Sequence, residues 1–150
     1  MLTEKDYCDY DTCVALKKLG YKEKTLAYYT SEGFFHWVRA YIYDVAIPDL
    51  ANSSNKKPYK HIIDAMSLYE AQKWLREEKT IIIEATFNLM YKGQPRFSWR
   101  VLYNLTQHKG AYYTLDSVMS KEDYDSYEEA LSEGVRKAIE ILKENETIHR

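Results

Sequence analysis

Polar side chains suited to binding an anion alternate with apolar ones in the second half of the chain. They are Arg96, Arg100, Asn88 and Thr86, all at even positions, and Arg39 extends the set from an earlier segment. An arginine guanidinium is planar, donates two parallel hydrogen bonds to a carboxylate or phosphate, and stacks on flat ligands. The pattern therefore predicts a candidate site for a small anionic or nucleotide-like ligand on one face of a sheet.

The same alternation has a structural interpretation, which we prefer. An antiparallel sheet commonly leaves one face in water, and on such a face Arg100 would form an ion pair with Glu84. A second basic segment lies in a loop and comprises Lys56, Lys57 and Lys60. Such a run can contact phosphates, but a solvated loop is its commoner role.

No constellation of residues typical of catalysis or metal binding is found in the sequence. The four histidines are scattered, and Cys8 and Cys13 are too close along an expected helix for good disulfide geometry and too few for a zinc site. The sequence also lacks a glycine-rich phosphate loop and a glycine-flanked nucleophilic serine. We therefore expect no catalytic residues, no metal and no cofactor, which makes an enzyme the least favoured class.

Capping signals, turn residues and apolar periodicity define the elements that would position these side chains. Asp9 caps the first helix, and boxes that begin at Ser67 and Ser126 start two more. The expected elements are a helix over 10–19, strands over 25–30 and 34–43, a loop over 49–60, a helix over 67–79, strands over 80–91, 97–103 and 111–115, and a helix over 126–145.

The strands around the turn near Gly93 carry their apolar side chains at odd positions, from Ile81 to Tyr91 and from Phe97 to Tyr103. Two odd sets share a face only if the connecting loop has an odd length or the ladder contains a bulge. In the last helix, Gly134 costs roughly 1 kcal/mol relative to alanine, so we expect close packing there to offset this cost.

The expected fold class is α+β. We predict a single domain over residues 1–150, with element order α-β-β-α-β-β-β-α, in which two hairpin units form an antiparallel sheet and the helices pack on one face.

Composition restricts the partners. The chain has 150 residues, a formal net charge of −2 and a pI near 6.1. That balance gives no strong nucleic-acid signal. No apolar run is long enough to span a membrane, and the N-terminal residues lack an apolar signal segment, so we expect a cytoplasmic protein with free thiols. The chain is rich in tyrosine, with 15 residues, which suits half-buried sheet faces and binding surfaces alike.

Three segments together resemble a family of short uncharacterised proteins from phages and mobile elements of gut Bacteroidetes. They run from Asp9 to Tyr21, from Ser67 to Glu77, and from Ser126 to Leu131 with Gly134. The resemblance covers most of the chain but not the hairpins or the loop over 49–60. It implies a setting, that of small accessory proteins of phages, which often act by binding host proteins or signalling molecules, and it implies no site residues.

Three hypotheses follow from the sequence. The first is a non-enzymatic binding protein that acts on a host protein or self-associates as a homo-oligomer. The second is a protein that sequesters a small anionic ligand through the arginine-bearing face or the basic loop. The third, an enzyme, has the least support.

Overall fold

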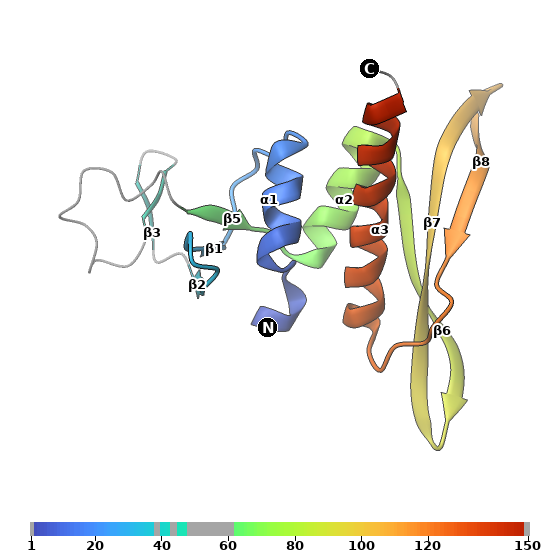
Figure 1. Cartoon of the computed structure of the whole chain (residues 1–150), viewed down its shortest axis with the longest axis horizontal. Coiled ribbons are helices and arrows are strands. Elements are labelled where there is room, and N and C mark those ends of the chain that lie inside the picture. The colour runs from blue at the N-terminus through green and yellow to red at the C-terminus, as the bar shows by residue number, and fades with distance from the viewer. Residues whose placement is uncertain (1, 38–39, 43–44, 48–61, 149–150) are drawn as a thin grey trace. The chain divides into compact units, whose positions relative to one another are not determined.

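The computed structural model describes residues 2–37, 40–42, 45–47 and 62–148 (Figure 1). The chain divides into two compact units, Met1–Ser67 and Leu68–Arg150. The α+β class is confirmed, and every sheet pairing between named strands is antiparallel. The expected element order is confirmed, with short additional elements in the first unit, and the two expected hairpin units belong to separate sheets.

The first unit is built from one α-helix and several three-residue strands. Its elements are the 3-10 turn η1 (Glu4–Asp6), α1 (Tyr10–Lys18), β1 (Ala27–Tyr29), β2 (Phe35–Trp37), β3 (Ala40–Ile42), β4 (Val45–Ile47) and β5 (Ile63–Ala65). β1 lies between β2 and β5, and β3 pairs with β4. The expected first hairpin is therefore confirmed as β1 and β2, whereas Ala40–Ile42 of its expected second strand form β3, which pairs with β4.

Helix α1 begins as the sequence predicts. The Asp9 carboxylate accepts a hydrogen bond from the backbone N–H of Thr12 at 2.8 Å. The buried face of α1 includes Cys13 and Leu16, neither of which is exposed to solvent. The Tyr29 hydroxyl donates to the Cys8 carbonyl oxygen at 2.7 Å, and burial raises the pKa of this phenol, so the donor keeps its proton.

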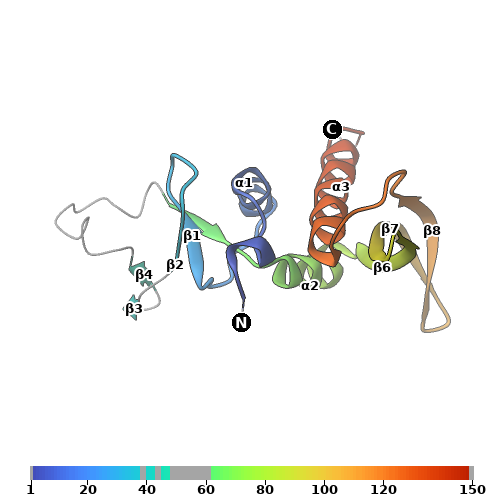
Figure 2. The same ribbon diagram turned by 90° about the horizontal axis from the view of Figure 1, so that it is seen from below.

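The second unit carries two longer helices and a three-stranded sheet. Its elements are α2 (Leu68–Lys79), β6 (Ile82–Tyr91), β7 (Gln94–His108), β8 (Ala111–Met119) and α3 (Tyr127–Ile148). β7 is the central strand, and α3 packs along one side of the β6–β7 ladder (Figure 2). The Ser126 hydroxyl accepts from the backbone N–H of Glu129 at 3.1 Å, so the expected cap of α3 is present.

Gly134 lies where α3 meets the sheet. A Cβ atom at this position would lie 2.7 Å from Cγ2 of Ile83 and 3.3 Å from Cβ of Trp99. Ala130 and Ala138, one turn away on each side, are fully buried. The close packing expected at Gly134 is therefore confirmed, and it brings α3 against the sheet more closely than any larger residue would allow.

Candidate functional site

The β6–β7 ladder has two different faces. On the covered face, Ile83 pairs with Val101 and both are buried beneath α3. On the opposite face, here called the open face, Glu84 pairs with Arg100 and Thr86 pairs with Ser98. Directly paired residues of an antiparallel ladder share a face, so the polar even positions are collected on the side away from α3.

A bulge at Asn88 explains how apolar residues at odd positions of both strands can lie on one face. The connecting loop is the two-residue turn Lys92–Gly93, with φ values of 49° and 77°, typical of a type I′ hairpin. Because this loop is even in length, the apolar sets can share a face only through a bulge, and the register shifts between Phe87 and Leu89. The bulge predicted as one of the two alternatives is confirmed.

The bulge also corrects the sequence pattern at the hairpin tip. Beyond Asn88, Leu89 pairs with Arg96, and Tyr91 pairs with Gln94. Since Arg96 alternates with Ser98 and Arg100 along β7, Leu89 and Tyr91 lie on the open face and not on the covered one. Their odd positions are misleading because one unpaired residue inverts the alternation that follows it.

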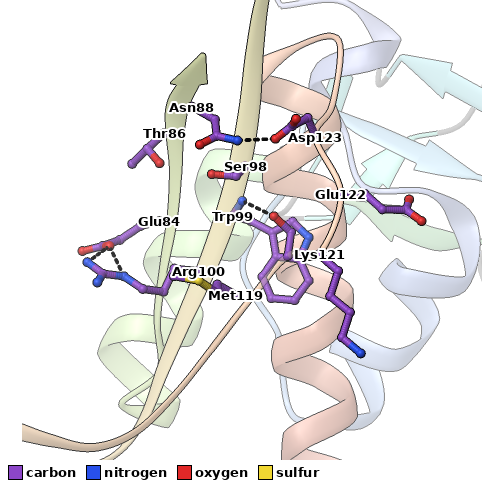
Figure 3. Close-up of a pocket in the computed structure, with 11 residues that line it drawn as sticks. Glu84, Thr86, Asn88, Ser98, Trp99, Arg100, Met119, Lys121, Glu122 and Asp123 are labelled. Carbon is purple, nitrogen blue, oxygen red and sulfur yellow. Dashed lines mark hydrogen bonds and ion pairs between the residues drawn. The ribbon is translucent and has the colours of Figure 1, made fainter.

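A pocket of about 530 Å³ is hollowed in the open face (Figure 3). It is lined by residues of β6 and β7 and by the segment that follows β8: Glu84, Thr86, Asn88, Ser98, Trp99, Arg100, Met119, Ser120, Lys121, Glu122 and Asp123. Three acidic and two basic side chains are among them, so the lining has a formal charge of −1. The centre of the open face is therefore polar and nearly neutral.

The wall of this pocket is a loop that leaves the ladder and returns to it. After Met119 pairs with Arg100, the backbone N–H of Ser120 donates to the Trp99 carbonyl oxygen at 2.9 Å. The ladder resumes at Tyr124, which exchanges two backbone hydrogen bonds with Phe97, at 2.8 and 2.9 Å. Lys121, Glu122 and Asp123 are looped out between these two points.

Side-chain contacts fix both arginines of the open face. Nε and Nη2 of Arg100 donate to Oε2 of Glu84 at 2.9 and 2.6 Å, which confirms the structural interpretation of that residue. Arg96 forms an ion pair with Asp125, and its Nη2 donates to the carbonyl oxygen of Asp123 at 2.9 Å. Each arginine therefore already has a carboxylate partner.

The predicted site residues are brought together only in part. Thr86, Asn88 and Arg100 line the pocket, and the Asn88 amide donates to the Asp123 carboxylate. Arg96 lies on the same face but holds the loop instead of lining the pocket. The remaining predicted residues lie outside the described residues: Arg39, Lys56, Lys57 and Lys60.

The sequence pattern did not predict the loop residues of the pocket. Lys121, Glu122 and Asp123 lie far from β6 in sequence, and only the excursion after β8 brings them to its side chains. The one available signal was the cluster of charged residues after Met119, which is also what an ordinary solvated turn would show.

Apolar side chains lie at both ends of the open face. Met119, which pairs with Arg100, is 64% exposed, while Leu89 and Tyr91 at the hairpin tip are 40% and 58% exposed. Aromatic residues and methionine are enriched at protein–protein interfaces relative to the rest of the surface. The open face thus combines apolar ends with a hydrogen-bonding middle.

The residues that line the pocket include no histidine or cysteine. In the part of the chain that the structure describes, no group of three or more histidine, cysteine, aspartate or glutamate side chains is arranged to hold a metal ion. Among those same residues, no helix has the length and apolar character needed to cross a membrane.

No family model, curated protein or solved structure matches the chain. The resemblance to phage and mobile-element proteins therefore stays a prediction, and the geometry of the open face is the basis for the function proposed below.

Proposed function

We propose that this protein is a non-enzymatic binding protein whose open face contacts a protein partner. The observation that carries the proposal is the exposure of Met119, Leu89 and Tyr91 on the same face, at opposite ends of a polar pocket. Burying large apolar side chains provides most of the favourable free energy in protein association. The fitting partner is a protein surface with apolar contacts around a neutral, hydrogen-bonding centre.

The charges of the open face favour a protein partner over a phosphorylated ligand. Arg100 is bound by Glu84 through two hydrogen bonds, and Arg96 is held by Asp125. An anion would have to displace one of these carboxylates and would also meet Glu122 and Asp123 at the pocket wall. The alternative function, sequestering a small anionic ligand, therefore has less support from the described residues.

We place this binding function in a phage or mobile-element setting, with a host protein as the partner; counter-defence is the role that goes with the ligand-sequestering alternative. This setting rests on the sequence resemblance alone.

Capture from host lysate tests the proposal. Immobilised parent protein is compared with a Met119→Ser, Tyr91→Ser double variant, and bound proteins are quantified by mass spectrometry. We expect the specific partner to be lost by about tenfold or more, because a few buried apolar anchors dominate typical interfaces.

The matched control is the double variant Leu26→Ser with Phe34→Ser, whose parent side chains are 62% and 63% exposed in the first unit. Retention of the partner by this control, with loss in the open-face variant, supports the proposal. Equal retention by both variants contradicts it. Saturable heat on titration with pyrophosphate, abolished by Arg100→Met, would instead support the anion-binding alternative.

A further inference from the structure

The two outer edges of the β6–β7–β8 sheet differ in how well they are protected against pairing with another strand. Within the part of the chain that the structure describes, β6 and β8 each pair only with β7, so each strand has one outer edge. Unpaired backbone N–H and C=O groups on such an edge are a template for another strand, and most proteins block them with bulges, lysines, prolines or a covering element.

The β6 edge is blocked. The Gln72 side chain of α2 donates a hydrogen bond to the Ile83 carbonyl oxygen at 2.8 Å, which occupies an acceptor at the start of the strand. Further along, the bulge at Asn88 interrupts the regular spacing of the backbone groups. A partner strand would therefore find no long, regular set of acceptors and donors on this side.

The β8 edge has none of these protections among the described residues. Its register with β7 is constant from Met119 to Ala111, without a bulge, and Figure 1 shows β8 on the outer side of β7. The strand contains no lysine, arginine, proline or glycine. Its one charged residue, Asp116, accepts a hydrogen bond from Asn104 of the neighbouring strand at 2.6 Å.

The hydrogen-bond pattern identifies backbone groups that face outward. The N–H of Ser120 donates to β7, and backbone groups alternate sides along an antiparallel strand. The N–H and C=O of Met119 and Ser117 therefore point away from β7. Ser117 is exposed, so its outer backbone groups are accessible to another strand.

We infer that the outer edge of β8 pairs antiparallel with β8 of a second copy of this chain. The edge carries a single charged side chain, Asp116, which accepts a hydrogen bond from Asn104 within its own sheet, so pairing of two copies brings together only this one pair of like charges. A second copy also offers an edge of equal length and regularity. The product is a two-fold symmetric dimer with one continuous six-stranded sheet.

This inference is independent of the proposed function, because it uses the backbone edge of β8 and not the side chains of the open face. Sedimentation equilibrium of the full chain tests it directly. We expect the parent to shift, with rising concentration, from the monomer mass of 17.8 kDa to twice that value.

Ser117→Pro is the diagnostic variant. Proline removes an outward N–H and is tolerated on an edge strand, whereas Ser117→Ala keeps the N–H and is the matched control. We expect the proline variant to raise the dimer dissociation constant by about tenfold or more, and the alanine variant to leave it unchanged.

Ser117→Lys is a second route that does not rely on proline. It places a lysine on the edge strand of each copy, which is a device by which natural sheets prevent edge pairing, so it should weaken the dimer. Circular dichroism shows whether each variant is folded. If the proline variant is unfolded, the dissociation constant of the lysine variant decides the test. A parent that stays monomeric at millimolar concentration, or a dimer insensitive to the edge variants that fold, overturns the inference.

Discussion

Replacing Gly134 with alanine should destabilise the protein, although alanine is the better helix former. Within a helix, this substitution alone would stabilise by about 1 kcal/mol. In this structure the added Cβ would lie 2.7 Å from Cγ2 of Ile83 and 3.3 Å from Cβ of Trp99. Neither neighbour is the free end of a flexible side chain, because Ile83 is only 3% exposed and the Trp99 Cβ is attached directly to the backbone of β7.

Relief of this contact requires α3 to move away from the sheet. Overpacking of a core by one methyl group costs roughly 1–3 kcal/mol, so the net loss after the helix gain is about 0–2 kcal/mol. In urea unfolding, this loss of stability should appear as a lower midpoint with an unchanged slope.

A double-mutant cycle separates the cost of the close contact with Ile83 from the gain in helix propensity. In an Ile83→Ala background the nearest contact is removed, so Gly134→Ala should be less costly there than in the parent, and the two changes should couple by about 1 kcal/mol or more. If Gly134→Ala instead stabilises the parent by about 1 kcal/mol, the close approach of α3 to β6 is not rigid and the reasoning fails.

Three further outcomes follow from the described contacts. Asp9→Ala removes a helix cap and should cost about 1 kcal/mol in urea unfolding, whereas Asp9→Asn should cost clearly less. Arg96→Met frees the loop wall, so the backbone amide of Tyr124 should exchange hydrogen faster by mass spectrometry while global stability changes little; unchanged exchange would contradict the anchoring role. Tyr29→Phe removes the hydrogen bond to Cys8 and should cost about 1 kcal/mol near neutral pH. Because burial raises the pKa of this phenol, the unfolded chain loses its proton first, so the parent should lose stability above about pH 10 and the phenylalanine variant should lose less.

Local signals in the sequence were sufficient for the helices and for the main hairpin. Asp9 and Ser126 are capping residues whose effect depends on the next three residues alone, and both caps are present. The bulge in β6 was one of two outcomes that the alternation allowed, and the even loop at Lys92–Gly93 decides between them. Gly134 was informative because glycine destabilises a helix, so its presence inside α3 indicates close packing against a neighbouring element.

Non-local features were beyond the sequence pattern. β5 is three residues long, too short to show an alternation, and its pairing with β1 joins segments separated by about half of the first unit. The pocket needs the loop after β8 to return to Phe97, a pairing that no periodicity encodes. The sequence also could not reveal that Arg96 is tied to Asp125, because that partner lies in the loop.

Because of the bulge at Asn88, the odd-numbered residues of β6 face α3 before the bulge and lie on the open face after it. Deleting this single residue would make the ladder continuous and would leave Leu89 paired with Arg96 and Tyr91 with Gln94, so the tip side chains would stay on the open face. What would be lost is the Asn88 hydrogen bond to Asp123 and the irregularity in the outer edge of β6. Loss of one residue here would thus keep the open face and the core while giving β6 a regular outer edge with which another strand can pair.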